Sequence, residues 1–243
     1  MSHLSQRSLS ILKALADVLL PTVCYICEKS CSAEFGLCEE CLAKIRYIPY
    51  PYCTKCGRGC SAGDDLCPEC RDNATSAVEK AWSCCYYTDT VKDCIHLFKY
   101  RGYAGLADIF GYIMLEFAEK NGLFENIDFI VPVPMHSSKK RERSYNHAEL
   151  LARFIAKRSF VSLDSKNLKK IKWTQSQSEL DKAKRLNNVK DTFLVIDKEI
   201  FRDKSILLID DVYTTGATIN ECAGTLLSSG SKKVFSFTLA RGV

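Results

Sequence analysis

Ile206-Leu207-Leu208-Ile209-Asp210-Asp211-Val212-Tyr213-Thr214-Thr215-Gly216-Ala217-Thr218 is the stretch of this chain that decides its fold. The four apolar residues at its start are typical of a parallel strand that is buried on both faces. Two adjacent carboxylates follow at the carboxyl end of this strand, and a short loop of Thr and Gly then opens a helix. Ligands of open α/β sheets bind at this edge. The stretch therefore predicts an α/β fold with a ligand site beside Asp210 and Asp211.

The chemistry of the same stretch points to a phosphosugar. A loop at a helix N-terminus offers backbone N–H groups and hydroxyls to an anion, so we expect it to hold a phosphate. Neighbouring carboxylates accept hydrogen bonds from sugar hydroxyls or help to hold a divalent cation such as Mg²⁺. The pattern resembles the phosphoribosyl pyrophosphate (PRPP) motif of type I phosphoribosyltransferases; an ordinary helix N-cap is the alternative. The residues expected to contact PRPP are Asp210, Asp211, Thr214, Thr215, Gly216, Ala217 and Thr218.

The composition is that of a chain with a substantial core, since 47% of its 243 residues are hydrophobic. This length predicts one medium domain plus a small appendage. The chain contains neither a Gly-x-x-x-x-Gly-Lys-Thr loop nor a Gly-x-Gly-x-x-Gly loop. The sequence therefore does not support ATP hydrolysis or dinucleotide binding through such loops.

No apolar run approaches the length of a membrane span. The stretch from Leu9 to Leu20 is largely apolar, but Lys13 and Asp17 interrupt it and its leucines recur at helical spacing. No small-residue cleavage site follows it, so we expect an amphipathic packing helix rather than a signal peptide. These features predict a cytoplasmic protein without membrane insertion.

Positive charge is concentrated in residues 131–190, which hold 15 Lys and Arg against 5 Asp and Glu. The whole chain carries a formal net charge of only +5. A segment this basic suits a polyphosphate or a nucleic-acid backbone. A solvated, lysine-rich helix face is the alternative interpretation.

Ten of the fourteen cysteines form a duplicated pattern with an offset of 29 residues. Each unit reads Cys-x2-Cys-x3-Cys-Ser-Ala-x4-Cys-x2-Cys. A Cys-x2-Cys knuckle places two thiolates on a tight turn, and two knuckles complete a tetrahedron for Zn²⁺. The expected metal ligands are Cys24, Cys27, Cys38, Cys41, Cys53, Cys56, Cys67 and Cys70.

Two zinc ions, each bound within its own repeat, are the simplest assignment. Interleaved pairing between the repeats, a single metal site, an iron–sulfur cluster and a disulfide framework remain alternatives. Cys31 and Cys60 exceed a shell of four ligands, so no metal role is assigned to them. Because so short a segment has little core of its own, metal binding would supply much of its folding energy.

The remainder of the chain alternates between predicted strands and helices. Residues 78–88 are expected to form a strand that is one arm of a hairpin, because apolar and polar residues alternate there. The other predicted elements are helices at 91–101, 105–120 and 148–159 and strands at 129–135, 193–195 and 234–239.

Two polar segments are candidates for contact with the ligand. Residues 136–147 are predicted as a basic loop between a strand and a helix, where pyrophosphate can be bound. Arg143 is the better candidate because a guanidinium makes bidentate contacts with phosphate oxygens, and Lys140 is the weaker one. Residues 172–188 are predicted as a mobile loop that closes over the site and excludes water. Simple surface connections are the alternative for both.

Taken together, these features resemble the ComF family, which includes competence protein ComFC and the GntX-like proteins. The resemblance covers nearly the whole chain and includes the cysteine knuckles, His96-Leu-Phe-Lys-Tyr-Arg-Gly102, Val131-Pro-Val-Pro134 and the PRPP-type motif. Family members have Gly at the position of Ser144, and Ser lacks the freedom of Gly at positive φ. Residues with the family's spacing in the loop at 172–188 are Thr174, Gln177, Leu180, Arg185 and Asn188.

The resemblance implies a type I phosphoribosyltransferase-like parallel sheet flanked by helices, with a small N-terminal zinc-finger module. We expect the module at residues 1–76 and the larger domain at 77–243. The resemblance also implies a cytoplasmic role in natural transformation, in which the protein handles incoming single-stranded DNA. DNA-uptake proteins would then be partners.

Our working mechanism gives Asp210 and Asp211 the catalytic role of contacting the ribose of PRPP, directly or through Mg²⁺. Arg143 neutralises the departing pyrophosphate, and catalysis rests on positioning and electrostatics. Two other functions fit the sequence: a PRPP sensor without turnover, and a salvage transferase that acts on a small base.

The acceptor is expected to bind to the N-terminal part, because the sequence ends at Val243, directly after the last predicted strand. Single-stranded DNA is the acceptor that we consider, lying across the knuckles and the basic segment. Aromatic residues on which its bases could stack are Tyr25, Tyr50, Tyr52 and Trp173, with packing as the alternative for each.

Overall fold

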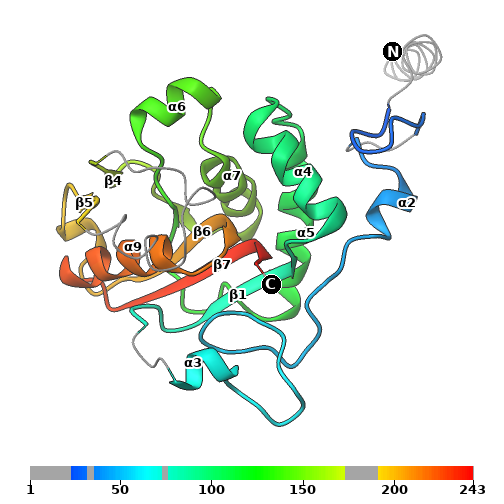
Figure 1. Ribbon diagram of the computed structural model, residues 1–243. Coiled ribbons are helices and arrows are strands. Elements are labelled where there is room, and N and C mark those ends of the chain that lie inside the picture. The colour runs from blue at the N-terminus through cyan, green and yellow to red at the C-terminus, as the bar shows by residue number, and fades with distance from the viewer. Residues whose placement is uncertain (1–22, 32–35, 73–75, 173–190, 243) are drawn as a thin grey trace, which may run out of the picture.

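The computed structural model describes residues 23–31, 36–72, 76–172 and 191–242, and its centre is a parallel five-stranded sheet (Figure 1). The strand order is β1-β7-β6-β2-β3, and every neighbouring pair is parallel. The predicted α/β fold with a parallel sheet is therefore confirmed. The strands are β1 (Ala81–Tyr86), β2 (Phe129–Pro132), β3 (Ser162–Leu163), β6 (Ser205–Tyr213) and β7 (Lys233–Arg241).

The expectation that residues 78–88 form one arm of a hairpin was wrong. Their strand, β1, lies at an edge of the sheet and pairs in parallel with β7. The first five residues of β1 are all buried, so this strand is covered on both faces rather than on one. A strand of this kind belongs in a parallel sheet, whereas a solvated hairpin arm alternates between buried and exposed residues.

Helices cover both faces of the sheet, as Figure 1 shows. Alternate residues of β6 point to opposite sides: Leu207 and Ile209 pack with the first group of helices, whereas Ile206 and Leu208 pack with α9. The first group consists of α4 (Asp89–Tyr100), α5 (Leu106–Lys120) and α7 (His147–Ser159), and α9 spans Ala217–Ser228. Among the described residues, no helix is long and apolar enough to cross a membrane.

Shorter elements surround this core. A two-stranded antiparallel sheet joins β4 (Leu168–Lys170) to β5 (Phe193–Val195), and the 3₁₀ turn η2 (Glu199–Phe201) precedes β6. The helix α6 (Ser137–Arg143) lies between β2 and α7. The apolar stretch at residues 9–20, predicted as a packing helix, lies outside the described residues.

The cysteine-rich part is irregular apart from two short helices, α2 (Glu39–Leu42) and α3 (Pro68–Asp72). Its second repeat packs directly on the edge strand β1. A Cβ atom on Gly57, where φ is +70°, would lie 3.0 Å from the backbone nitrogen of Ser83. The backbone N–H of Ala81 also donates a hydrogen bond to the carbonyl oxygen of Thr54 at 3.1 Å. The second repeat is thus built onto the sheet.

Two helical glycines are expected to respond in opposite ways to replacement by alanine. A Cβ on Gly111 in α5 would lie 2.3 Å from the ring of Phe154 in α7, whereas a Cβ on Gly224 in α9 would meet no described atom within 4 Å beyond its own helix backbone. Gly111→Ala should therefore destabilise the protein by about 1–3 kcal/mol through overpacking. Gly224→Ala should stabilise it by about 0.5–1 kcal/mol, because alanine is favoured over glycine within a helix.

Denaturant unfolding of the two variants checks this prediction. Similar midpoints for both would show that α5 and α7 do not approach each other as closely as described.

Candidate functional site

A cavity of about 490 Å³ lies at the carboxyl end of β6. The end of β6 and the start of α9 contribute acidic residues and hydroxyls, and the segment from β2 to α6 and the last turn of α4 contribute basic and aromatic side chains. The residues that line the cavity include Lys99, Tyr100, Lys139, Arg143, His147, Lys170, Asp210, Asp211, Thr214 and Thr218. The cavity occupies the sheet edge at which the sequence predicted a ligand.

The two carboxylates lie within β6, which continues to Tyr213, rather than after the end of the strand. Asp211 is buried, and its Oδ1 lies 2.7 Å from Nζ of Lys99 in α4. Burial raises the pKa of Asp210 to about 7, and the neighbouring charge of Asp211 contributes further. The adjacent acids therefore differ: Asp211 forms an ion pair, and Asp210 exchanges a proton near neutral pH.

Lys99 is a functional candidate that the sequence analysis missed. Burial lowers its pKa, but the Asp211 carboxylate outweighs this effect, so the pKa of Lys99 lies above its ordinary value. Lys99 therefore remains charged and brings the end of α4 to the acidic strand. Lys99 lies in the segment His96–Gly102, which resembles the ComF family, but nothing in that segment alone indicates a contact with Asp211.

A neutral histidine lies beside this ion pair. Burial lowers the pKa of His147 to about 4, and its Nε2 has no hydrogen-bond partner among the residues that the structure describes. The ring packs against Phe98 and Tyr145, with centroid distances of 5.0 and 5.1 Å. His147 thus presents an uncharged imidazole to the cavity at physiological pH.

The predicted basic loop at residues 136–147 contains a helix, α6, which corrects that expectation. His136 caps the helix, since its Nδ1 accepts a hydrogen bond from the backbone N–H of Ser138 at 3.3 Å. Ser144 ends the helix at φ +68°, so it adopts the left-handed conformation despite not being glycine. Only the turn after Arg143 retains the character of a loop.

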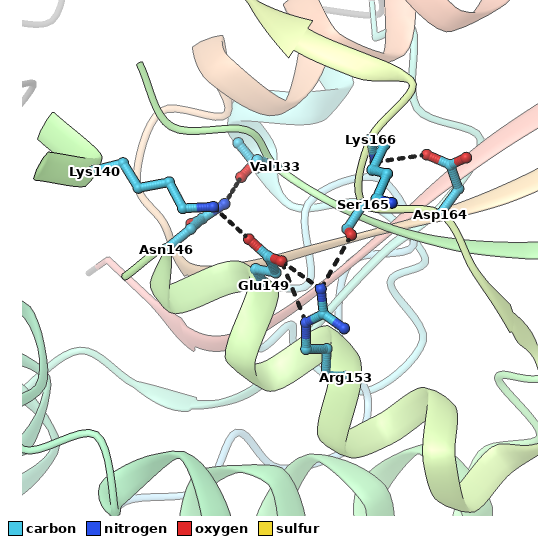
Figure 2. A network of polar contacts seen from close by, with 8 residues as sticks. All are labelled: Val133, Lys140, Asn146, Glu149, Arg153, Asp164, Ser165 and Lys166. Carbon is cyan, nitrogen blue, oxygen red and sulfur yellow. Dashed lines mark hydrogen bonds and ion pairs between the residues drawn. The ribbon is translucent and has the colours of Figure 1, made fainter. Parts of the chain in front are cut away.

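The helix separates the two predicted phosphate ligands of this segment. Arg143 lines the cavity, with its guanidinium 4.6 Å from the ring centroid of Tyr100. Lys140 does not line it, because its Nζ lies 3.1 Å from a carboxylate oxygen of Glu149, which also binds Arg153 (Figure 2). Lys139, four residues before Arg143 and on the same helical face, lines the cavity instead.

A further lysine, Lys170, adds positive charge to the lining of the cavity. Lys170 in β4 lines the cavity, and both burial and the charge of Lys139 lower its pKa. The charges of Lys139 and Lys170 therefore lie close enough to disfavour each other. The helical period of residues 137–143 would have identified Lys139 from the sequence, but Lys170 lies in a segment without a motif.

The predicted phosphate loop is only partly open to the cavity. Thr214 and Thr218 line it, whereas Thr215, Gly216 and Ala217 do not. Gly216 adopts φ +77° as the N-cap of α9, which allows the abrupt turn from strand to helix. The predicted loop residues Thr174, Gln177 and Arg185, together with Leu180 and Asn188, lie outside the described residues.

The eight predicted metal ligands form two groups, each within its own repeat. Within each group the Sγ atoms all lie within 4.8 Å of one another. The Cys27–Cys38 and Cys56–Cys67 Sγ distances are 3.6 and 3.7 Å. A Zn–S bond of about 2.3 Å places tetrahedral ligands about 3.8 Å apart, so both groups fit Zn²⁺. All fourteen cysteines are free, which excludes the disulfide alternative in this structure.

These two four-cysteine groups indicate structural zinc, with one site per repeat. Cys31 and Cys60 belong to neither group. The Sγ of Cys60 instead lies 3.6 Å from the carbonyl oxygen of Arg58. The spacing of the sequence thus identified the correct grouping of the ligands.

Replacing Lys99 with Met should destabilise the folded protein by about 3 kcal/mol, because Asp211 would remain buried without its partner. The side chains of Lys99 and Asp211 are only 21% and 8% exposed, so solvent screens their pairing weakly. Thermal or denaturant unfolding measures the effect. In a double-mutant cycle, Lys99→Met with Asp211→Asn should cost less than the sum of the single changes; additive costs would show that the pair is not coupled.

One protein family and several solved structures are similar to parts of this chain. The double zinc ribbon domain family matches residues 15–71, which contain all eight cysteine ligands. The solved structure of a glutamine PRPP amidotransferase from B. subtilis aligns over 59% of this chain and 30% of its own, with 12% identity and a TM-score of 0.40. A hypoxanthine phosphoribosyltransferase from Staphylococcus aureus aligns over 56% of this chain and 74% of its own, with 12% identity and a TM-score of 0.35.

Curated relatives resemble a larger part of the chain. Competence protein F of Haemophilus influenzae is 27% identical over 213 residues, 86% of this chain and 92% of the relative. Competence protein ComFC of Bacillus subtilis is 32% identical over 157 residues, 64% of this chain and 61% of the relative. DNA utilization protein YhgH of Salmonella typhimurium is 27% identical over 158 residues, 64% of this chain and 69% of the relative. The chain thus combines a segment that matches the double zinc ribbon family with a parallel α/β sheet, and it is similar in sequence to competence proteins F and ComFC.

Proposed function

We propose that this protein binds PRPP together with Mg²⁺ in the cavity at the end of β6. The observation that supports this proposal is the chemistry of the cavity lining: Asp210, Thr214 and Thr218 line the same cavity as the basic side chains of Lys139, Arg143 and Lys170. PRPP carries a 5-phosphate, ribose hydroxyls and a pyrophosphate, so it needs acceptors for hydroxyls and cations for phosphates within one site.

The residues of the cavity take distinct roles in this proposal. The Thr214–Thr218 loop binds the 5-phosphate through backbone N–H groups and hydroxyls at the start of α9. Asp210 accepts hydrogen bonds from the ribose hydroxyls or contacts Mg²⁺. Asp211 holds Lys99 in place across the 2.7 Å ion pair rather than contacting the sugar alone.

Arg143 and Lys139 would bind the pyrophosphate, so Lys139 takes the role that the sequence analysis gave to Lys140. Arg143 is held by its stacking on Tyr100, which fixes the plane of the guanidinium. If the ribose is transferred, these cations stabilise the negative charge that develops on the departing pyrophosphate. Pyrophosphate release is the property that separates a transferase from a PRPP sensor.

We further propose a cytoplasmic role in the handling of incoming DNA during natural transformation. The names of the relatives support it, since they are competence proteins and DNA utilization proteins. The excess of Lys and Arg in residues 131–190 is suited to a nucleic-acid backbone. We propose single-stranded DNA because the chain also has exposed tyrosines, on which unpaired bases can stack.

The structure distinguishes among the tyrosines considered for base stacking. Tyr25 packs edge-on against Tyr103 at 4.8 Å, and the hydroxyl of Tyr52 donates a hydrogen bond to Oδ1 of Asn121 at 2.6 Å. Tyr50 is 85% exposed and is therefore the tyrosine we propose for stacking. Trp173 lies outside the described residues.

PRPP binding should strengthen as the pH rises from 6 to 8, because Asp210 must lose its proton to accept hydrogen bonds or contact Mg²⁺. Its pKa of about 7 places the change in this window. Isothermal titration calorimetry with PRPP and Mg²⁺ measures the affinity. Asp210→Asn should bind more weakly and show only the smaller pH dependence of the ligand's own phosphate, which titrates near pH ~6. Wild-type affinity in this variant would contradict the proposal.

Tyr50→Ala should weaken the binding of a single-stranded oligonucleotide roughly tenfold, the loss of one stacked base. Ile196→Ala is the control, since Ile196 is a large apolar side chain that is 63% exposed and lies outside both the cysteine repeats and the basic segment at residues 131–190. Fluorescence anisotropy at low salt provides the measurement. Equal affinities for both variants would remove Tyr50 from the DNA surface, and no affinity for the oligonucleotide in the wild type would end the proposed DNA role.

A further inference from the structure

The second four-cysteine group, formed by Cys53, Cys56, Cys67 and Cys70, shares a buried cluster with the residue that begins the turn of the proposed phosphate loop. Tyr213, the last residue of β6, belongs to the same cluster as Cys53, Cys56 and Cys67. Burial raises the pKa of Tyr213. The phenol is therefore packed in the buried cluster that contains three of the four cysteines.

The side chain of the same tyrosine packs directly against the backbone of Gly216. A Cβ atom on Gly216 would lie 2.2 Å from the hydroxyl oxygen of Tyr213, so the backbone of the loop rests directly on this side chain. Any change in the position of the Tyr213 ring must move the turn between β6 and α9. The loop that would hold the phosphate is thus shaped by Tyr213, which packs in the same buried cluster as the cysteines.

Arg241 fixes the other side of the turn. Its Nη1 donates hydrogen bonds to the carbonyl oxygens of Tyr213, at 3.0 Å, and of Thr214. The guanidinium also lies over the Tyr213 ring, 4.7 Å from the centroid, and the residue is 3% exposed. Arg241 therefore contacts both the backbone and the ring of this turn.

The chain that leaves the second repeat is tied to the same helix start. The backbone N–H of Ala77 and the hydroxyl of Ser76 both donate hydrogen bonds to Oδ1 of Asn220, at 3.2 and 3.0 Å. The backbone N–H of Asn220 in turn donates to the carbonyl oxygen of Gly216 at 2.8 Å. A second, independent route therefore connects the second repeat to the loop.

The first four-cysteine group packs elsewhere. Two of its members, Cys24 and Cys41, belong to the buried cluster that contains Phe98 of α4 and Leu106 of α5. The two repeats are equivalent in sequence, but they lie against different parts of the larger domain. This difference provides an internal control.

We propose that Tyr213 and Arg241 are positioning residues that transmit the metal-bound shape of the second four-cysteine group to the phosphate loop. Metal in the second group, but not in the first, is then required for the loop to take its binding conformation. This inference deepens the proposed function, since it concerns the loop assigned to the 5-phosphate of PRPP.

The test compares Cys56→Ser with Cys27→Ser, which are equivalent positions 29 residues apart. Both full-length variants should lose one zinc by metal analysis. Hydrogen exchange of the peptide that contains residues 213–218 should accelerate in Cys56→Ser and stay as in the wild type in Cys27→Ser. PRPP affinity should fall about tenfold or more in Cys56→Ser alone, a loss typical of removing support from a site.

A second pair of variants separates loop support from general unfolding. Arg241→Lys keeps the charge but loses the planar fork, so it should retain both zinc ions while loop exchange accelerates. Tyr213→Phe keeps the ring beneath Gly216 and should exchange nearly as the wild type does. Equal loop exchange in Cys27→Ser and Cys56→Ser, or an unchanged loop in Arg241→Lys, would overturn the inference.

The exchange measurement does not depend on PRPP. If the wild type binds no PRPP, the proposed function fails, while the comparison of loop exchange still decides whether the second four-cysteine group supports the loop.

Discussion

The ion pair between Lys99 and Asp211 is the interaction on which the candidate site depends. Two adjacent carboxylates at the end of a buried strand repel each other, and this repulsion, together with burial, raises the pKa of Asp210 to about 7. Lys99 neutralises one of the two and joins the last turn of α4 to β6 across 2.7 Å. The remaining acid can then respond to a ligand near neutral pH. Arg143 and Lys139 line the same cavity and add positive charge to it.

The duplicated cysteine units are integrated into the larger domain. One unit packs with α4 and α5, and the other with β1 and the start of α9. A double zinc ribbon of this kind cannot form a large core, so metal binding would stabilise both the ribbon and the surfaces on which it packs. The first four-cysteine group thus packs with the helix that carries Lys99, and the second shares a buried cluster with Tyr213 at the end of β6.

The features that the sequence predicted correctly depend on local chemistry. The strand before Asp210 follows from four consecutive apolar residues, and the grouping of the eight cysteines follows from their spacing within each repeat. The features that it missed depend on tertiary contacts. Lys99 becomes significant only because α4 ends beside β6. The strand β1 pairs in parallel with β7 and is buried on both faces, as is usual for a parallel sheet. Residues 136–147 were predicted as a loop, so the sequence analysis named Lys140 and did not consider Lys139, whereas the helix α6 brings Lys139 to the cavity.

A crystal structure of the full-length protein soaked with PRPP and Mg²⁺ tests the central claim most directly. The account predicts the 5-phosphate on the backbone N–H groups of Thr214–Thr218, the ribose hydroxyls or Mg²⁺ on Asp210, and the pyrophosphate beside Arg143 and Lys139. Lys99 should still be paired with Asp211 in that complex. PRPP bound away from the end of β6, or a cavity that remains empty at saturating ligand, would contradict the account.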